Sequence, residues 1–470
     1  MLKEVKESPF RSTKITITYG PSIADYNILK ECFKAGADIL RYNFSHGNES
    51  EFGEVVEKVE RIERELKRYI PILADLQGPK FRVDILDLPY RDIETGDFVK
   101  IYFKDVKVSG SIYIDYEDLG KSLKRGNKIY IEDGKIRLTV EEINENYVKC
   151  KVVKGGRVLK KKGINFPDVA LKLPSLTEKD KKDVKSALKF RVDYFCLSFV
   201  RNKKDVEELK NICEDVKVVS KIEKPQALSN IEGIIDISDG IMVARGDLGI
   251  EVEIEKIGII QKEIIRKCRR RRKPVIIATQ MLESMINSLI PTRAEATDIT
   301  NGVLDGADSL MLSGETSVGK YPVETIKVMD RIIGFSQRYE DRRKYISTFH
   351  PVELVETISH SAALAMSDLK IEKCVIFTIS GNTASVISHF HPYAEIFAFS
   401  PDPRVCREIN LFYGVRSFYL PIFKNSDEMI KSGLDILLGE GLLKKGDRII
   451  ILCGNVENLS VTNIMRIAEI

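Results

Sequence analysis

Short apolar segments alternate with longer amphipathic segments along residues 13–330. The apolar segments are rich in Val and Ile and have the length of strands, whereas segments such as VEKVERIERELKR carry the spacing of surface helices. The predicted strands are residues 14–18, 38–44, 71–76, 194–199, 217–222, 240–246, 274–279 and 309–314. Eight such strands joined by helices favour an α/β fold of the (β/α)8 TIM barrel type over an open sheet.

Two parts of the chain depart from this alternation. The first contains strand-like segments separated by Gly- or Asn-containing turns, which predicts a small β-barrel domain inserted between the third and fourth barrel strands. The second, beyond about residue 345, alternates again and indicates a separate open α/β domain. We therefore expect a barrel from residues 1–82 and 164–345, an inserted β domain at 83–163, and a C-terminal domain at 346–470.

The segment VKVVSKIEKP, residues 217–226, places two charges in an apolar strand. Side chains alternate along a strand, so Lys221 and Glu223 share one face while Ile222 takes the other. Burying an unpaired charge costs several kcal/mol, so both groups need partners. Other polar residues end six of the seven remaining strands, where TIM barrels carry their active sites. They are Arg41, Asn43, Ser45, Asp75, Ser198, Arg245, Asp247, Thr279, Ser313 and Glu315.

These residue types together indicate phosphoryl transfer. Glu223 and Asp247 end neighbouring strands and suit a hard divalent cation, because Mg²⁺ takes one or two carboxylates and completes its shell with substrate oxygens and water. Lys221 and Arg41 supply positive charge for a phosphate or a developing oxyanion. Thr279 is a candidate proton donor or relay, and the N–H groups of GDLGIEV suit an anion.

Simpler explanations exist for parts of this pattern. Lys221 and Glu223 alone are compatible with a strand-end salt bridge, and Arg245 with Asp247 is compatible with an ordinary turn. The glycines of GDLGIEV lack the GxGxxG spacing of a dinucleotide site, and the sequence contains no GxxxxGK[ST] motif. His46 lies beside the predicted site and is a candidate ligand contact.

Composition narrows the classes of protein further. The 470 residues include 74 basic and 70 acidic side chains, a near-balance that argues against nucleic acid as a partner. No apolar run reaches the roughly 18 residues of a membrane span, so we expect no membrane partner. The eight cysteines are scattered without metal-ligand spacing, as in a cytoplasmic protein with reduced thiols.

Several motifs of the chain resemble the pyruvate kinase family. They are TKITITYGPS, RYNFSHG, ADLQGPKFR, SKIE, GIMVARGDLGIE, KPVIIATQMLESM, PTRAEATD and DGADSLMLSGETSVGKYP. The combination of ATQMLESM with LSGET is highly specific, and the ordered set spans residues 13–330. The resemblance implies transfer of a phosphoryl group from phosphoenolpyruvate to ADP, giving ATP and pyruvate in the last step of glycolysis.

The same resemblance implies roles for individual residues. Glu223 and Asp247 would bind Mg²⁺ or Mn²⁺, and Lys221 would steady the phosphoryl group during transfer. Arg41 would bind the phosphate, and Thr279 would lie on the proton route to the enolate. The amides of Gly246 and Asp247, together with Thr279, would hold the substrate carboxylate. Ser313 and Glu315 would extend the proton route. The nucleotide would be contacted by Asn43, His46, Arg82 and Lys162. The inserted domain resembles the family's lid, which would bring Asp133 over the mouth of the site.

One departure from the family pattern concerns a monovalent cation. The common form binds K⁺ through residues that match Asn43, Ser45 and Asp75 and a threonine at the position of Leu76. It also carries a glutamate where this chain has Lys80. Because a lysine ammonium can stand in for the charge of the ion, we expect membership of the K⁺-independent branch and activity without K⁺.

The C-terminal domain resembles the family's effector and oligomerisation module, which implies an allosteric homotetramer. In TISGNTAS, residues 378–385, hydroxyls and a glycine lie between a predicted strand and helix and suit a phosphate. The candidate contacts to a phosphorylated effector are Thr378, Ser380, Asn382 and Thr383. An ordinary N-capped turn is the alternative, and the identity of the effector stays open.

Two other functions compete with this interpretation. One is a class II aldolase-like lyase that uses phosphoenolpyruvate or another oxoacid on the same barrel, but the inserted β domain and ATQMLESM argue against it. The other is a non-catalytic binding protein on an inherited barrel. Such a protein would be expected to lose Lys221, Glu223, Asp247 or Thr279, and all four are present.

Overall fold

Eight parallel strands form a closed barrel at the centre of the computed structural model, which describes residues 10–103, 108–167, 169, 174–339, 346, 349–454 and 462–470. The barrel strands are β1 (Lys14–Thr18), β2 (Ile39–Asn43), β3 (Ile72–Asp75), β13 (Tyr194–Leu197), β14 (Lys217–Ile222), β15 (Gly240–Ala244), β16 (Val275–Ala278) and β17 (Ser309–Met311). Each lies within a segment predicted as a strand, so the prediction of a TIM barrel is confirmed. Their order around the barrel is β1-β17-β16-β15-β14-β13-β3-β2.

Several predicted strands are too long at their carboxyl ends. The segment GIMVARG stops being a strand at Ala244, and Arg245 begins the short helix α8 (Arg245–Glu251). Most of the segment GDLGIEV is therefore helical. Asp247 lies in the first turn of this helix, where the helix dipole stabilises a negative charge.

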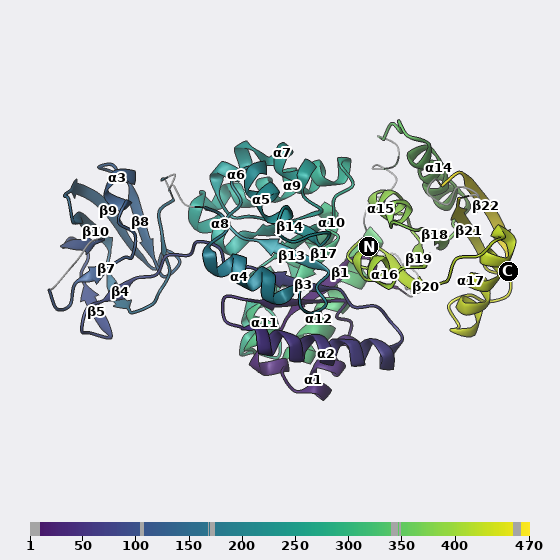
Figure 1. Ribbon diagram of the computed structural model, residues 1–470, viewed down its shortest axis with the longest axis horizontal. Helices are drawn as coiled ribbons and strands as arrows, with labels where there is room; N and C mark the ends of the chain where they lie inside the picture. The colour runs from purple at the N-terminus through teal and green to yellow at the C-terminus, as the bar shows by residue number, and fades with distance from the viewer. Residues whose placement is uncertain are drawn as a thin grey trace.

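Helices surround the barrel (Figure 1). They are α1 (Tyr26–Lys34), α2 (Glu49–Leu66), α4 (Glu178–Ala187), α5 (Lys203–Lys210), α6 (Pro225–Ser229), α7 (Ile231–Ile237), α9 (Ile257–Arg270), α10 (Arg293–Asp305), α11 (Gly314–Ser317) and α12 (Pro322–Ser336). The sequence marks several of their starts: Thr177 and Thr292 form capping boxes at α4 and α10, and Asn48 caps α2. The buried face of α2 holds Phe52, Val55, Val56, Val59 and Ile62, the spacing of an amphipathic helix.

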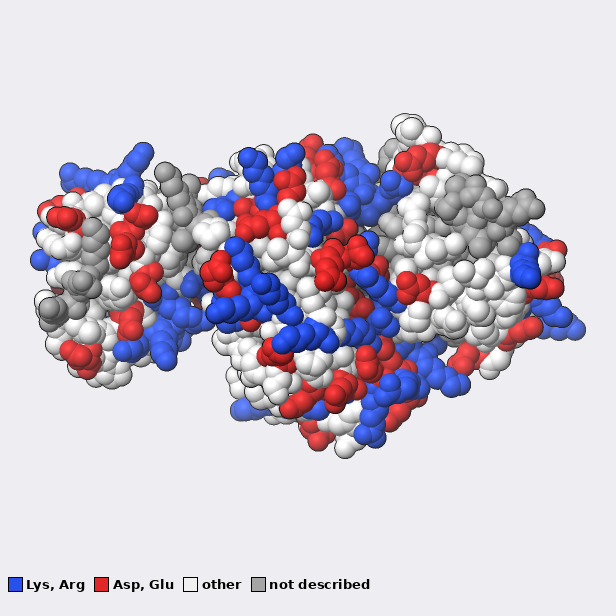
Figure 2. Space-filling model, in the orientation of Figure 1, with Lys and Arg blue, Asp and Glu red and all other residues white. Residues whose placement is uncertain are grey.

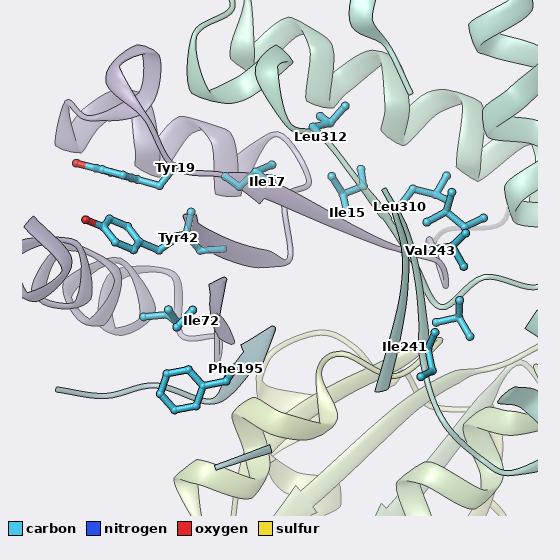
Figure 3. Close-up of a cluster of buried hydrophobic side chains, with 14 of the residues drawn as sticks. Ile15, Ile17, Tyr19, Tyr42, Ile72, Phe195, Ile241, Val243, Leu310 and Leu312 are labelled. Atoms are coloured by element: carbon cyan, nitrogen blue, oxygen red, sulfur yellow. The ribbon is translucent and has the colours of Figure 1, made fainter. Parts of the chain in front are cut away.

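The alternation of side chains along the barrel strands separates two layers of core. Outward-facing residues such as Ile15, Ile241 and Leu310 pack beneath the helices in one large cluster (Figure 3). Inward-facing residues form a second cluster: Ile39, Leu73, Tyr194, Cys196, Val219, Met242, Ile276, Ala278 and Met311, with Leu411 from the C-terminal domain. Full burial of an aliphatic or aromatic side chain contributes about 1.5–3 kcal/mol, so these layers fix the barrel that positions the site.

The inserted β domain lies between β3 and β13 in the chain and at one end of the molecule (Figure 1). A seven-stranded sheet has the order β12-β8-β9-β10-β6-β7-β4, and β11 pairs with β5. The bounds are β4 (Asp84–Ile85), β5 (Tyr90–Ile93), β6 (Phe98–Tyr102), β7 (Ile112–Tyr113), α3 (Leu119–Ser122), β8 (Lys128–Ile131), β9 (Ile136–Ile143), β10 (Tyr147–Lys154), β11 (Gly156–Leu159) and β12 (Ile164–Asn165). This domain has its own apolar core, and its two connections to the barrel meet in a bridge between Arg82 and Gly163.

The C-terminal domain is a five-stranded sheet of order β20-β19-β18-β21-β22, with an apolar cluster on each side. Its elements are α14 (Leu354–Leu369), β18 (Lys373–Phe377), α15 (Asn382–His389), β19 (Glu395–Ser400), α16 (Pro403–Ile409), β20 (Val415–Tyr419), α17 (Ser426–Gly439), β21 (Arg448–Cys453) and β22 (Ile464–Glu469). The strand β22 runs antiparallel to β21 at the edge. The expected domain limit at residue 345 lies outside the described residues.

Basic and acidic side chains are intermixed over all three domains on the face shown in Figure 2. Within the described part of the chain, no helix is both long enough and apolar enough to cross a bilayer.

Candidate active site

Four charged groups meet at the carboxyl ends of β2, β3 and β14. Lys221 Nζ lies 3.0 Å from Glu223 Oε1 and 3.3 Å from Asp75 Oδ1. Arg41 Nε donates a hydrogen bond of 2.6 Å to the other oxygen of Asp75. The side chains of Asp75 and Glu223 are each 1% exposed, so two buried carboxylates balance two cations. The expectation that the strand-end charges compensate each other is borne out by these distances.

The barrel's alternation explains why these residues come together. Ile39, Leu73 and Val219 face the barrel interior, and the residues two positions later on the same strands are Arg41, Asp75 and Lys221. The interior therefore changes from an apolar layer to a charged layer at the carboxyl ends of the strands. Salt-bridged charges in this position avoid the cost of isolated buried ions.

The surroundings perturb the two central ionisable groups. Burial lowers the pKa of Lys221, but the nearby carboxylates of Asp75 and Glu223 outweigh burial and leave that pKa well above its ordinary value. Burial raises the pKa of Glu223, and Asp247 acts in the same direction, while Lys221 opposes both. Lys221 is therefore a fixed positive charge at neutral pH. A further cation beside Glu223 would stabilise the ionised form of its carboxylate.

Ser198 and Phe199 are functional neighbours to which the sequence assigned no role. Ser198 Oγ accepts a hydrogen bond of 2.8 Å from Lys221 Nζ and donates one of 2.8 Å to the carbonyl of Leu76. The Phe199 N–H donates a hydrogen bond of 2.7 Å to Glu223 Oε2, and Phe199 has a φ of 55°. A bulky residue in this left-handed conformation is strained and has no sequence signal.

Glu223 directly follows β14, and Asp247 lies in the first turn of α8, which follows β15. The strands β14 and β15 pair in parallel, so both acids lie at the same end of neighbouring strands. Lys80 Nζ approaches Asp247 Oδ1 to 3.7 Å. Within the described ranges there is no group of three or more His, Cys, Asp and Glu residues suited to a metal. A carboxylate pair such as Glu223 and Asp247 nonetheless fits Mg²⁺ or Mn²⁺, because such an ion takes its other ligands from substrate and water.

Thr279 and Gly246 form the next part of the site. The Gly246 N–H donates a hydrogen bond of 2.8 Å to Thr279 Oγ1, and Thr279 has a φ of 70°. Arg245, which the sequence placed at a strand end without a role, holds this turn. Its Nη2 donates to the carbonyl of Thr279 at 2.7 Å, and its Nη1 lies 2.7 Å from Asp298 Oδ2.

Glu315 connects two loops on the opposite side of the barrel from Asp75. Its carboxylate accepts hydrogen bonds of 3.0 Å from the Leu282 N–H and 2.7 Å from the Ser313 N–H, and the residue is 2% exposed. The hydroxyl of Ser313 is buried and has no hydrogen-bond partner within the described residues. Glu315 thus holds the two loops together, while the Ser313 hydroxyl makes no hydrogen bond within the described residues.

The predicted monovalent-cation residues are adjacent but already engaged. Asn43 Oδ1 accepts a hydrogen bond of 3.0 Å from the Ser45 N–H, and the register pairs Asn43 with Asp75. The two oxygens of Asp75 face Arg41 and Lys221. Leu76 is 1% exposed and offers no side-chain oxygen.

Of the predicted nucleotide and lid residues, Arg82 and Lys162 lie in the two connections of the inserted β domain. Arg82 Nη1 donates a hydrogen bond of 3.0 Å to the carbonyl of Lys161, and Lys162 Nζ lies 3.3 Å from Glu132 Oε1. Asp133 follows Glu132 in the turn between β8 and β9 and has a φ of 54°. His46 is exposed beside Asn43, whose carbonyl accepts from the His46 N–H at 3.3 Å.

The predicted effector residues form the turn between β18 and α15. Thr378 Oγ1 accepts a hydrogen bond of 3.1 Å from the Gly381 N–H, and Gly381 has a φ of 82°. Ser380 and Asn382 are exposed. Thr383 is buried, and its hydroxyl binds the hydroxyl of Thr462 instead of pointing to solvent.

Comparisons with known proteins agree with this geometry. Residues 10–326 match the family described as "Pyruvate kinase, barrel domain", and residues 356–468 match "Pyruvate kinase, alpha/beta domain". A pyruvate kinase of Corynebacterium efficiens is 39% identical over 95% of this chain and 94% of its own length, and one of Thermococcus litoralis is 38% identical over 99% and 100%. The crystal structure of a pyruvate kinase from Cryptosporidium parvum superposes with a TM-score of 0.92 at 34% identity, covering 98% of this chain and 96% of the other. On the fold, the site and these matches, the chain belongs to the pyruvate kinase family.

Proposed function

We propose that the charged layer around Lys221 is the place where this enzyme transfers the phosphoryl group of phosphoenolpyruvate to ADP, producing ATP and pyruvate. The observation that carries the proposal is the buried network of Arg41, Asp75, Lys221 and Glu223, with Asp247 in the helix that follows the neighbouring strand β15. Phosphoryl transfer is catalysed mainly by positioning and by electrostatic stabilisation, which such a network supplies. The comparisons favour neither a lyase nor a non-catalytic binding protein.

In this proposal, Glu223 and Asp247 hold a Mg²⁺ or Mn²⁺ ion. When bound, the ion neutralises charge on the substrate oxygens and orients them. The direction of the Glu223 pKa supports the assignment: burial and Asp247 both disfavour the ionised carboxylate, so a cation between the two acids relieves a built-in repulsion.

Lys221 and Arg41 act on the migrating phosphoryl group. The raised pKa of Lys221 keeps its ammonium charged throughout the reaction. The contacts of Lys221 with Asp75, Glu223 and Ser198 hold that ammonium in one position, so it need not reorganise as charge develops. Arg41, fixed by Asp75, binds the phosphate before and after transfer.

Thr279 lies on the proton route to the enolate that remains after transfer. In this structure its hydroxyl accepts from the Gly246 N–H, one of the groups assigned to the substrate carboxylate together with Asp247. A bound carboxylate would compete for the Gly246 N–H and free the hydroxyl of Thr279. Glu315 and the unused hydroxyl of Ser313 extend the route away from the substrate.

The inserted β domain closes over the site and brings Asp133 to its mouth, with Arg82, Lys162, Asn43 and His46 contacting the nucleotide. Lys162 is paired with Glu132 in the present arrangement, so nucleotide binding exchanges one anionic partner for another. Closure excludes water, which strengthens the electrostatic interactions within the site.

The enzyme works without K⁺ in this proposal. The support is threefold: Leu76 has no side-chain oxygen, both oxygens of Asp75 face cations, and Lys80 brings an ammonium to 3.7 Å from Asp247. Turnover should be retained when K⁺ and NH₄⁺ are replaced by a bulky organic cation. Loss of nearly all turnover under that condition would refute K⁺ independence.

The C-terminal domain, residues 346–470, is proposed to bind a phosphorylated effector and to take part in a homotetramer in the cytoplasm. Exposed Ser380 and Asn382, on either side of the buried Gly381, support a phosphate contact, whereas Thr378 and Thr383 are engaged internally. Titrating nucleoside monophosphates and sugar phosphates into phosphoenolpyruvate saturation curves tests the effector. Unchanged curves for all of them would contradict it, and analytical ultracentrifugation tests the tetramer.

A coupled assay with phosphoenolpyruvate, ADP and Mg²⁺ tests the function as a whole. Wild type should form ATP and pyruvate in equal amounts, and Lys221→Met should lower kcat by about 10³-fold, the order lost when a preorganised charge is removed. Lys431→Met, an exposed change on α17, serves as the matched control and should keep full activity. Absence of ATP formation with either Mg²⁺ or Mn²⁺ would overturn the proposal.

A further inference from the structure

Glu251 is a buried carboxylate for which the phosphoryl-transfer chemistry has no use. It ends α8, the helix whose first turn carries Asp247, and its side chain is 2% exposed. Glu251 Oε1 lies 2.6 Å from Lys224 Nζ and accepts a longer hydrogen bond of 3.4 Å from Asn165 Nδ2. A buried charge of this kind is costly unless its partners compensate it, so both contacts need an explanation.

The partner Asn165 lies two residues beyond the expected limit of the inserted β domain at residue 163, but its strand β12 joins the sheet of that domain. This strand pairs antiparallel with β8 through Asn165 with Tyr130 and Ile164 with Ile131. A change in the orientation of that domain therefore moves Asn165 together with the sheet. The contact from Asn165 to Glu251 connects the sheet directly to the barrel.

The partner Lys224 belongs to the barrel loop that carries the proposed metal ligand Glu223. It is the next residue in the chain, and its ammonium lies 5.6 Å from the ring centroid of Phe199. The N–H of Phe199 in turn binds Glu223. Glu251 thus sits between the inserted domain, the loop of Glu223 and the helix of Asp247.

A cavity adjoins the contacts of Asn165 and Lys224. This cavity of about 120 Å³ is bordered by Phe81 and Phe166, which lie in the two connections of the domain, and by Phe199 of the barrel. Apolar contacts along such a cavity are non-directional, whereas a hydrogen bond to a charged acceptor depends on direction. The polar contact is therefore the element able to select one orientation of the domain.

We propose that Glu251 is a positioning residue that couples the orientation of the inserted β domain, through Asn165 and Lys224, to the loops that carry Glu223 and Asp247. The proposal rests on the metal-binding role assigned above to those two acids. When the inserted domain closes, the contact fixes the loops of Glu223 and Asp247 in the positions that belong to the closed domain. When the contact breaks, the domain and the metal-binding loops become independent of each other.

Exchanging the amide and the carboxylate provides the sharpest test. Asn165→Asp is nearly isosteric and places a second negative charge against Glu251, which should break the contact. The double variant N165D/E251Q restores an amide–carboxylate pair with the same net charge, so it should restore the contact. Glu63→Gln, which removes another largely buried barrel carboxylate paired with Arg191, is the matched control.

The readout is a distance between the two bodies in the full-length enzyme. All eight cysteines are buried, so spin labels can be attached selectively at Lys151→Cys on exposed β10 and Lys185→Cys on exposed α4. In N165D the distance distribution should broaden and shift, Mn²⁺ affinity should fall by about 10-fold, and kcat should fall by a similar factor. N165D/E251Q should return the distance distribution to near wild type but leave Mn²⁺ affinity and kcat reduced, because the amide introduced by E251Q no longer forms an ion pair with Lys224. E63Q should leave all three unchanged.

An unchanged distance distribution in N165D, or a double variant whose distance distribution does not recover, would overturn the proposal. A shifted distribution with unaltered Mn²⁺ affinity would also overturn it, because the coupling would be absent. If N165D does not fold, E251Q alone must broaden the distribution for the proposal to stand. Failure of the metal assignment itself would look different: Glu223→Gln would then leave Mn²⁺ affinity unchanged while the distance measurements still responded to N165D.

Discussion

Asp75 holds the two cations proposed to handle the phosphoryl group, so Asp75→Asn is the most informative single change. The side chain is 1% exposed and lies 2.6 Å from Arg41 Nε and 3.3 Å from Lys221 Nζ. At an effective dielectric constant of about 20, each contact corresponds to roughly 5 to 6 kcal/mol of Coulomb energy. Removing the carboxylate also removes its desolvation cost, so the net loss is smaller. Breaking a buried ion pair by deleting one partner typically costs about 3–5 kcal/mol.

The expected result for D75N is therefore a fall of about 3–5 kcal/mol in the free energy of unfolding. For a domain of this size, that corresponds to a decrease in Tm of about 6–20 °C. Urea and thermal unfolding followed by circular dichroism measure both quantities. Asp84→Asn is the matched control, because Asp84 and Lys160 form a half-exposed pair 2.9 Å apart whose loss should cost at most about 1 kcal/mol.

The same variant should alter the pH dependence of activity. Burial lowers the pKa of Lys221, and the carboxylate of Asp75 is the strongest influence in the opposite direction. In D75N the pKa of Lys221 should fall, so kcat should decline at a lower alkaline pH than in wild type. A D75N enzyme with the stability of D84N and the alkaline profile of wild type would refute the idea that Asp75 neutralises these cations.

Three further predictions concern other parts of the molecule. Glu223→Gln should weaken Mn²⁺ binding by at least about 10-fold, measured by the spin resonance of the free ion, and unchanged affinity would contradict its role as a ligand. Thr279→Val should lower kcat by about 10²-fold with little change in KM for phosphoenolpyruvate, and Thr279→Ser should recover most of the activity, whereas equal loss in both variants would indicate a packing role. Burial raises the pKa of Asp308 to about 6, so the folded chain binds this proton more tightly than the unfolded chain and loses stability as the pH rises from about 4 to about 6. The unfolding free energy of Asp308→Asn relative to wild type should therefore increase by about 3 kcal/mol across that window in urea titrations, and a constant difference would exclude Asp308 as the cause.

The barrel and its site-bearing end are the parts that sequence patterns predict well. Buried strands must be apolar and surface helices must be amphipathic, so both leave a pattern in the sequence. The strand predicted at 217–222, for example, has the same limits as β14 in the structure. The polar ends of the strands are equally visible, because Lys221 and Glu223 break an apolar run. The two-residue strand β4 and the antiparallel β22 escaped prediction, since they are too short or too exposed to show a period.

Sequence alone therefore determined which residues carry charge, which strands they end and which family they resemble, because these properties are local in the chain. Closure of the barrel decided the pairings: the Phe199 N–H on Glu223, Ser198 on Lys221, and Glu251 between Asn165 and Lys224. Such contacts join loops that are far apart in sequence and depend on strand register and on backbone angles such as the positive φ of Phe199. A local pattern contains no information about either, so only the tertiary structure reveals which partner each buried charge finds.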